Sequence, residues 1–261
     1  MAPTTLSIER RGRIATVTFR RADQLNAMNR LMQREITETF EALGRDASIG
    51  AIVVTGDGRA FMAGADIKEY AAQSEAEFDD FQAKGERMYA AIEANAKPVI
   101  AAVNGYALGG GFELVLCCDI VVASSTAKMG LPEIKLGLVP GGGGTQRSVR
   151  KLGRNRANQL LMTGAIIPAE SFERWGLVNE LVAPDALLPR ALELAEAIAA
   201  EPAAAIEGLK RLTAIAASGD REAGLASERD LVSALFRSEI GKARVKAFAA
   251  KSEARAKGGK A

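Results

Sequence analysis

The chain has 261 residues, of which 48% are hydrophobic and 25% charged, and its formal net charge is +2. This is globular composition with enough length for a large core, and the small net charge argues against a nucleic-acid footprint. Histidine is absent, which excludes Ser-His-Asp and Cys-His catalysis and any metal site built on histidine. A catalyst in this chain must therefore use carboxylates, backbone N–H groups, Lys, Tyr or a cofactor.

The cysteines and the apolar runs indicate the compartment. Cys117 and Cys118 are adjacent within an apolar run, where they are expected to be core residues and not a disulfide framework, which favours a reducing compartment. The N-terminus lacks the charged start and apolar block of a secretory signal. No apolar stretch approaches the ~20 residues of a membrane helix. We expect a cytoplasmic protein without a membrane partner.

Strands and helices alternate through the first part of the chain in a repeated order. Hydrophobic periodicity and turn signals predict strands and helices in turn. The expected strands are 6–9, 14–19, 51–55, 98–103 and 120–123, and the expected helices are 29–43, 78–94 and a short one after residue 111. This recurrence of strand, strand and helix favours an α/β core of stacked units over a regularly alternating, doubly wound sheet.

The composition changes near Leu187. From there to the end Ala, Glu, Lys and Arg dominate with helical periodicity, which predicts three or four appended helices. We expect a core over residues 1–195 and a helical oligomerisation region over residues 196–261. The helix containing Leu225, Leu231, Leu235 and Phe236 has an apolar face too large for a free surface, so we expect other subunits to cover it.

The run "NGYALGGGFEL" at 104–114 places a carboxylate, Glu113, at the edge of an apolar segment. The run fits neither G-x-x-x-x-G-K-[ST] nor G-x-G-x-x-G. Consecutive glycines instead let a ligand atom approach the backbone, and the N–H groups that open the next helix would favour an anion or a developing oxyanion. Burying an unpaired charge is costly, so Glu113 is expected to cap, to pair or to act chemically.

Two further segments have the same character. "FMAGADIKE" at 61–69 follows a strand, although taken alone it reads better as a tight loop capped by Asp66. Residues 130–147 contain Glu133 on a proline-stiffened turn, followed by four glycines before a helix; alone, Glu133 could be a surface acid at a helix start. Together, two glutamates and two sources of outward N–H groups indicate an oxyanion hole beside a carboxylate pair.

At this point the chain resembles a known family. "AGADIKE", "NGYALGGGFEL" and "LPEIKLGLVPGGGGTQR", with residues 25–28 and the helical C-terminus, are similar to the enoyl-CoA hydratase/isomerase (crotonase) family over nearly the whole chain. The resemblance implies a crotonase-like spiral of stacked ββα units with a helical C-terminal trimerisation region. It also implies a homotrimer or a homohexamer (a dimer of trimers), acyl-CoA substrates, and no cofactor beyond the CoA of the substrate.

The resemblance also implies roles for individual residues. Ala65 and Gly110 match the two oxyanion-hole positions, and Glu113 and Glu133 match the catalytic glutamates of the hydratases. Residues 21–24 depart from the family, whose members commonly have a proline before the Leu-Asn-Ala stretch. The remaining matches are CoA-binding positions: Ala27, Ala63, Asp66, Ile67 and Lys68, with Phe236 and Lys251 reaching the CoA of a neighbouring subunit.

The expected activity is enoyl-CoA hydration in the breakdown of fatty acids or related acyl chains. By the resemblance, Glu113 deprotonates the water and Glu133 supplies the α-carbon proton. An isomerase, or another enolate-stabilising acyl-CoA enzyme of the family, is the alternative. A non-catalytic acyl-CoA binder is disfavoured by the intact pair of acids. A nucleic-acid role is disfavoured because the basic C-terminal run contains only Phe248 as an aromatic residue. No metal site is expected.

Overall fold

The strands form two sheets. The structure is a computed structural model that describes residues 3–258, except for the side chains of residues 218 and 251–258. The larger sheet has six strands in the order β1 (Leu6–Arg11), β2 (Ile14–Phe19), β3 (Ala51–Gly56), β5 (Val99–Val103), β7 (Ile120–Ser124) and β10 (Glu180–Val182). Its first pair is antiparallel and the other pairs are parallel.

The smaller sheet shows how the repeats stack. Its order is β4 (Ala60–Met62), β6 (Tyr106–Leu108), β8 (Lys128–Gly130) and β9 (Ile167–Pro168). In three successive repeats the first strand (β3, β5, β7) joins the larger sheet and the second strand (β4, β6, β8) joins the smaller one. This is the arrangement of stacked ββα units that the sequence predicted, and each short second strand ends where the pocket described below begins.

Alternating side chains of the larger sheet enter two different cores. Val54 and Ala101 face the main core, which also contains buried residues of α1 (Arg30–Arg45), α3 (Glu75–Glu93) and α4 (Gly110–Cys117). Val53 and Ile100 face the opposite way, toward α8 (Leu187–Ala199). Because strand side chains alternate between faces, fully apolar strands such as these must be covered on both sides.

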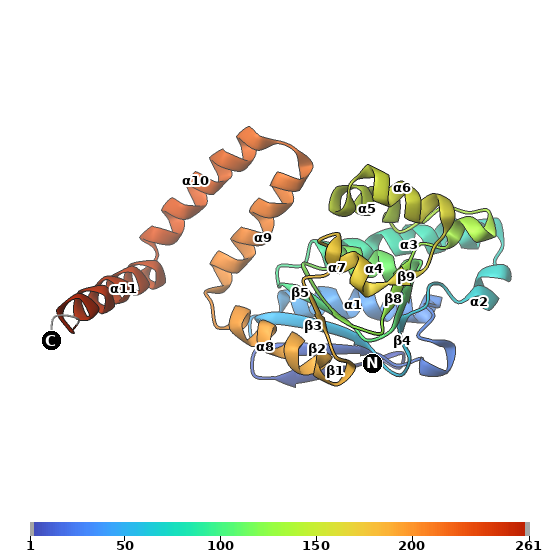
Figure 1. The fold of residues 1–261 in the computed structure, drawn as a ribbon, viewed down its shortest axis with the longest axis horizontal. Helices are drawn as coiled ribbons and strands as arrows, with labels where there is room; N and C mark the ends of the chain where they lie inside the picture. The colour runs from blue at the N-terminus through green and yellow to red at the C-terminus, as the bar shows by residue number, and fades with distance from the viewer. Residues whose placement is uncertain (1–2, 259–261) are drawn as a thin grey trace. The chain divides into compact units, whose positions relative to one another are not determined.

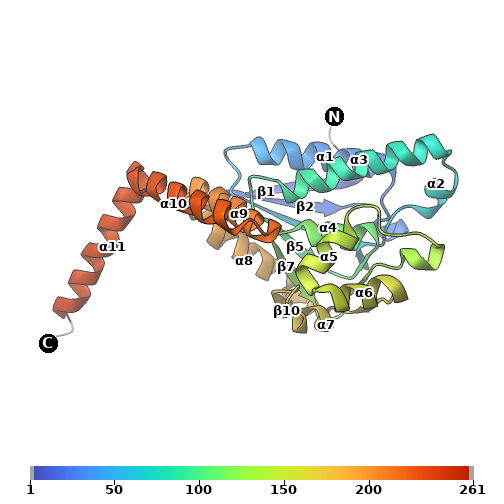
Figure 2. The same cartoon turned by 90° about the horizontal axis from the view of Figure 1, so that it is seen from above.

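The paired helices α1 and α3 run side by side in both views (Figures 1 and 2).

Helix α8 belongs to the sheet and not to the appended helices with which its composition groups it. Leu187, Ala191, Ala195 and Ala199 recur every four residues and are buried against the larger sheet. Small alanines let the helix approach the strands closely, and the Arg13 guanidinium donates a 2.7 Å hydrogen bond to the Ala199 carbonyl at its end. The division between the two compact units of the chain, Met1–Ala200 and Glu201–Ala261, accordingly follows α8.

Shorter helices connect the strands of the first unit. They are η1 (Ala22–Gln24), α2 (Ile67–Ala71), η2 (Glu133–Leu136), α5 (Gly144–Leu152), α6 (Arg154–Thr163), α7 (Ala169–Arg174) and η3 (Pro184–Ala186). Phe112 of α4 packs on Phe172 of α7 with ring centroids 5.0 Å apart, which ties the helix bearing Glu113 into the core.

The second unit consists of α9 (Ala203–Ser218), α10 (Arg221–Arg237) and α11 (Glu239–Gly258). Gly208 lets α10 approach α9, because a Cβ at this position would lie 2.4 Å from Cδ2 of Leu231. Large apolar side chains nevertheless remain exposed on this unit, among them Leu225, Val232, Phe236 and Ile240. No helix within residues 3–258 is long and apolar enough to cross a membrane.

Candidate active site

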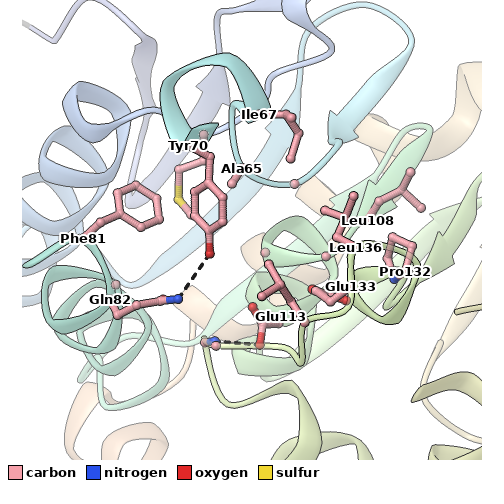
Figure 3. Close-up of a pocket in the computed structure, with 18 of the residues that line it drawn as sticks. Ala65, Ile67, Tyr70, Phe81, Gln82, Leu108, Glu113, Pro132, Glu133 and Leu136 are labelled. Carbon is pink, nitrogen blue, oxygen red and sulfur yellow. Dashed lines mark hydrogen bonds between the residues drawn. The ribbon is translucent and has the colours of Figure 1, made fainter. Parts of the chain in front are cut away.

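A pocket of about 300 Å³ lies in the first unit, where the second strands of the repeats end (Figure 3). The loop after β4, helices α2 and α3, the β6–α4 junction, η2 and the loop before α5 all contribute to its wall. Apolar side chains dominate the lining, and Glu113 and Glu133 are its two carboxylates. The three segments singled out in the sequence therefore meet in one place.

Glu113 lies in the first turn of α4 and is 3% exposed. Its Oε1 accepts hydrogen bonds from the N–H groups of Gly142 and Gly144, each at 2.8 Å. The second donor opens α5, so the carboxylate also sits at the positive end of a helix dipole. Burial raises the pKa of the Glu113 carboxyl, while the two N–H groups and the charge of Arg147 oppose that rise.

The glycines around the start of α5 are required by the close approach of their backbone to the Glu113 carboxylate. A Cβ at Gly142 would lie 2.1 Å from Cε2 of Tyr89 and 2.7 Å from Oε2 of Glu113. A Cβ at Gly144 would lie 2.9 Å from Oε1 of Glu113. The glycine run thus brings backbone donors onto a buried carboxylate that side chains would otherwise keep away.

Glu133 has a different environment. It begins η2 directly after Pro132, and its Oε2 is buried without a hydrogen-bond partner in the described part of the chain. Burial, with a smaller contribution from the charge of Glu113, raises the pKa of Glu133 to about 7. A carboxyl with this pKa retains a proton for transfer near neutral pH.

Two backbone N–H groups in the pocket wall are available to a ligand. Ala65 follows Gly64, whose φ is +93°, and Gly110 opens α4 after Gly109, whose φ is +50°. Neither the Ala65 nor the Gly110 N–H donates to another residue within the described chain. The two loops touch, since a Cβ at Gly109 would lie 3.7 Å from Cα of Gly64. Two N–H groups without an acceptor on neighbouring loops are what an oxyanion hole requires.

The other expected positions divide into two groups. Ala63 and Ile67 line the pocket, whereas Ala27, Asp66 and Lys68 lie outside its wall. The Arg21 guanidinium joins two of these outer residues, because it forms a 2.8 Å ion pair with Asp66 and donates to the Ala27 carbonyl. Arg21, which belongs to the stretch that replaces the family's proline, therefore braces the loop around residue 66.

Phe236 and Lys251 belong to the second unit. Phe236 lies on α10 and its side chain is exposed. Lys251 lies on α11, but its side chain is outside the described residues.

Sequence reasoning missed the polar residues of α2 and α3 that face the glutamates. The Tyr89 hydroxyl donates a 3.1 Å hydrogen bond to the carbonyl of Gly110, the residue whose N–H is available to a ligand. The Gln82 amide donates to the Tyr70 hydroxyl at 3.3 Å across the pocket (Figure 3). The sequence did contain a signal for them, because Gln82 and Tyr89 place polar groups on the apolar, core-facing side of a predicted helix. Within the described residues, no cluster of three or more Cys, Asp or Glu side chains could hold a metal ion.

A family model described as enoyl-CoA hydratase/isomerase matches residues 9–258. The chain belongs to the enoyl-CoA hydratase/isomerase family. It is 42% identical to a probable enoyl-CoA hydratase of Rhizobium meliloti, over 97% of this chain and 98% of the relative. It is 38% identical to a crotonyl-CoA hydratase of Syntrophomonas wolfei, with the same shares covered.

Solved structures of this family have the same fold. An enoyl-CoA hydratase of Bacillus anthracis superposes with a TM-score of 0.92 at 32% identity, covering 95% of this chain and 97% of that one. The family and the crotonase-like fold expected from the three motifs are thereby confirmed.

Proposed function

We propose that this chain is an enoyl-CoA hydratase, which adds water to 2-trans-enoyl-CoA to give 3-hydroxyacyl-CoA in the breakdown of fatty acids or related acyl chains. One observation carries the proposal: two carboxyl groups with opposite hydrogen bonding share a pocket with two free backbone N–H groups. The hydratases among its relatives support the same reaction.

The N–H groups of Ala65 and Gly110 hold the thioester oxygen. Attack of water on the β-carbon shifts electron density from the double bond onto this oxygen, and two donors stabilise the charge that develops there. Loss of one such donor typically costs about 3 kcal/mol in barrier. No cofactor is assigned beyond the CoA of the substrate itself.

The two glutamates handle the protons. Glu113, ionised and oriented by two N–H groups, takes a proton from water as the oxygen–carbon bond forms. Glu133, which holds its proton near neutral pH, donates it to the α-carbon. The pair then exchanges one proton with solvent to restore the starting state. The two acids titrate as a coupled pair.

The outer residues are assigned to CoA. Ala63 and Ile67, which line the pocket, would contact the substrate near the thioester. Lys68 and Asp66, with Ala27 joined to Asp66 through Arg21, would follow the pantetheine and phosphates. Phe236 and Lys251 would contact the adenine end of CoA bound to a neighbouring subunit.

The second unit is assigned to assembly. Val232, Phe236 and Ile240 are each about 60% exposed, a cluster of large apolar side chains that an isolated surface rarely carries. We propose a homotrimer or a homohexamer, and the two adjacent cysteines buried in the core support a cytoplasmic enzyme. Sedimentation equilibrium at micromolar concentration should show a trimer or a multiple of it; a stable monomer would contradict the assignment.

The activity test uses crotonyl-CoA and the loss of its enoyl thioester absorbance. Glu113→Gln and Glu133→Gln should each lower kcat at least ~100-fold, the scale of general acid–base catalysis. The double variant should lose less than the product of the two, because the pair acts as a unit. Binding of butyryl-CoA should persist in all three variants, since the Ala65 and Gly110 N–H groups are untouched.

An isomerase would behave differently. Moving a double bond can proceed with one proton carrier, whereas hydration needs two. If Glu113→Gln leaves hydration intact while Glu133→Gln eliminates double-bond migration, the chain is an isomerase and the hydratase proposal is wrong.

A further inference from the structure

Behind Glu113, an ion pair joins helices α3 and α5. Arg147 donates from Nε to Oε1 of Glu93 at 3.1 Å and from Nη2 to Oε2 at 2.6 Å. This is the bidentate fork that fixes a guanidinium in one orientation. The Arg147 side chain is only 16% exposed, although Glu93 is half-exposed. Neither residue lines the pocket, so neither can touch a substrate there.

The third arm of the guanidinium points toward the site. Nη1 of Arg147 donates to the carbonyl of Gly142 at 2.5 Å. The same Gly142 donates its N–H to Glu113 at 2.8 Å, so one residue is held from both sides. The guanidinium carbon also lies 5.9 Å from the centroid of the Tyr89 ring, within the range of a cation–π contact.

The turn between these groups leaves little freedom. Gly143 has a φ of +88°, and a Cβ there would lie 2.2 Å from Nη1 of Arg147. The guanidinium therefore packs directly on the backbone that carries the two donors to Glu113. If the guanidinium moved, the Gly142 and Gly144 N–H groups would lose the support that aims them.

We infer that Arg147, held in place by Glu93, is a positioning residue for Glu113: it aims the Gly142 and Gly144 N–H groups and supplies the positive charge that keeps this carboxylate ionised. The inference rests on the proposed role of Glu113 as the base. It adds two residues that act on Glu113 indirectly: Glu93 holds Arg147, and Arg147 acts through the backbone of Gly142 and through its charge. Only Glu113 meets the substrate.

Among the titratable groups around Glu113, Arg147 is the one whose positive charge favours the ionised form of this carboxyl. Glu133 of η2, Tyr70 of α2 and Tyr89 of α3 share the pocket wall with Glu113. Cys117 lies one turn further along α4, and Lys151 of α5 approaches the end of that helix. Burial raises the pKa of Glu113, and the charge of Arg147 opposes that rise. Burial lowers the pKa of Arg147, but the hydrogen bond to Glu93 and, to a smaller extent, the charge of Glu113 raise it. The same pair could instead serve only as a staple between two helices, so the test must separate charge from fold.

Three variants separate these roles. Arg147→Gln removes the charge and the fork. Arg147→Lys keeps the charge but cannot donate to Glu93 and Gly142 in the same planar arrangement. Glu93→Gln keeps the guanidinium but removes its anchor. Arg156→Gln is the matched control, because Arg156 also stacks on an aromatic ring, that of Trp175 at 5.6 Å, away from the pocket.

The pH dependence of kcat/KM for crotonyl-CoA is the first readout. Loss of the positive charge disfavours the Glu113 carboxylate, so in Arg147→Gln the acidic limb should move to higher pH by about one unit. Arg147→Lys should keep the limb in place and lower kcat about 10-fold or more, with KM little changed. Glu93→Gln should lower kcat without raising the limb, and Arg156→Gln should resemble wild type.

The second readout does not need activity. Titration of the Glu113 carboxyl by ¹³C NMR in protein labelled at the glutamate side chain, assigned with Glu113→Gln, should show the same upward shift in Arg147→Gln. The inference would be overturned if Arg147→Gln changed neither the Glu113 titration nor the acidic limb of kcat/KM and lowered only Tm. The ion pair would then serve only to hold the two helices together. If Arg147→Gln does not fold, wild-type kcat in Arg147→Lys would overturn the positioning role. Absence of hydration by wild-type protein would contradict the proposed function, whereas the NMR titration would still decide the inference.

Discussion

Glu113 and Glu133 line one pocket, yet the first carboxylate accepts two backbone N–H groups at 2.8 Å while the second has a buried oxygen, Oε2, with no partner among the described residues. A hydrogen-bonded carboxylate is stabilised in its ionised form, and a buried carboxyl without donors is stabilised in its protonated form. The backbone therefore distinguishes two chemically identical side chains, and this difference is what the proposed roles of Glu113 as base and Glu133 as acid require.

The pH dependence of hydration should reflect this difference. Because the pKa of Glu133 is raised to about 7, its proton is present below that pH and is lost above it. We expect kcat/KM for crotonyl-CoA to fall on the alkaline side of about pH 7, and to fall again at acidic pH as Glu113 is protonated. A profile that keeps rising through pH 9 would exclude Glu133 as the acid.

Replacing Glu133 should stabilise the protein while inactivating it. Its pKa rises from 4.5 to about 7 on folding, so the folded state binds the proton more tightly and folding becomes less favourable as pH rises through this window. Glu133→Gln removes that penalty. Its Tm should exceed that of wild type by roughly 2–4 °C at pH 8, and the difference should vanish near pH 4.5, where wild-type Glu133 is protonated.

The control for this measurement is Glu86→Gln, an exposed glutamate of α3 outside the pocket wall. It should leave Tm unchanged at both pH values. A stability gain of Glu133→Gln that is equal at pH 4.5 and pH 8 would show that the effect is packing and not the charge.

The first strand of each repeat was predictable because it is a buried, largely β-branched run that needs no tertiary information, whereas the ββα units were implied by the resemblance to the family. The three-residue strands β4, β6 and β8 were not, since so short a run shows no periodicity. The start of α3 was placed late, at residue 78, although Ser74 and Glu77 form a capping box that sets it at Glu75. The composition change at Leu187 groups α8 with the appended helices, although the expected boundary at residue 195 leaves most of α8 in the core; its packing on the sheet places the whole helix there.

The residues that meet in the pocket were predictable where they lie within motifs. Ala65, Gly110, Glu113 and Glu133 follow from three short stretches, since the glycines and acids are adjacent in the sequence. The ion pair of Glu93 and Arg147 joins residues 54 positions apart, and no local pattern marks either partner. Side chains that act through the packing of two helices become visible only in the fold.

Gly110 should tolerate no side chain. A Cβ there would lie 2.9 Å from the Tyr89 hydroxyl and 3.4 Å from Cε of Met28, so even a methyl group disturbs the hydroxyl that holds the Gly110 carbonyl. Gly110→Val should abolish measurable turnover of crotonyl-CoA, and Gly110→Ala should lower kcat by about 100-fold, the scale of a lost oxyanion-hole donor. Circular dichroism and sedimentation must show a folded, assembled protein. Near-normal turnover in such a variant would remove Gly110 from the oxyanion hole.

Tyr70 and Gln82 should limit the length of the acyl chain. The Tyr70 hydroxyl and the Gln82 amide are 3.3 Å apart and face Glu113 (Figure 3). The Tyr70 ring is buttressed edge-on by Phe78 and Phe81, with centroids 5.2 and 5.7 Å away. On its other side the Gln82 amide packs on Gly141, where a Cβ would lie 2.8 Å from Nε2. A polar bridge therefore crosses a wall in which apolar side chains predominate.

A longer acyl chain must part this bridge and leave two polar groups buried beside hydrocarbon. Breaking one neutral hydrogen bond in this way costs on the order of 1 kcal/mol or more. The double variant Tyr70→Phe with Gln82→Leu replaces the bridge with apolar surface of similar size, so the ratio of kcat/KM for 2-octenoyl-CoA to that for crotonyl-CoA should rise by about 5- to 10-fold. Tyr106→Phe, a tyrosine of β6 outside the pocket wall, should leave the ratio unchanged. If the ratio in the double variant equals that of wild type while crotonyl-CoA turnover is normal, another part of the wall selects the acyl chain.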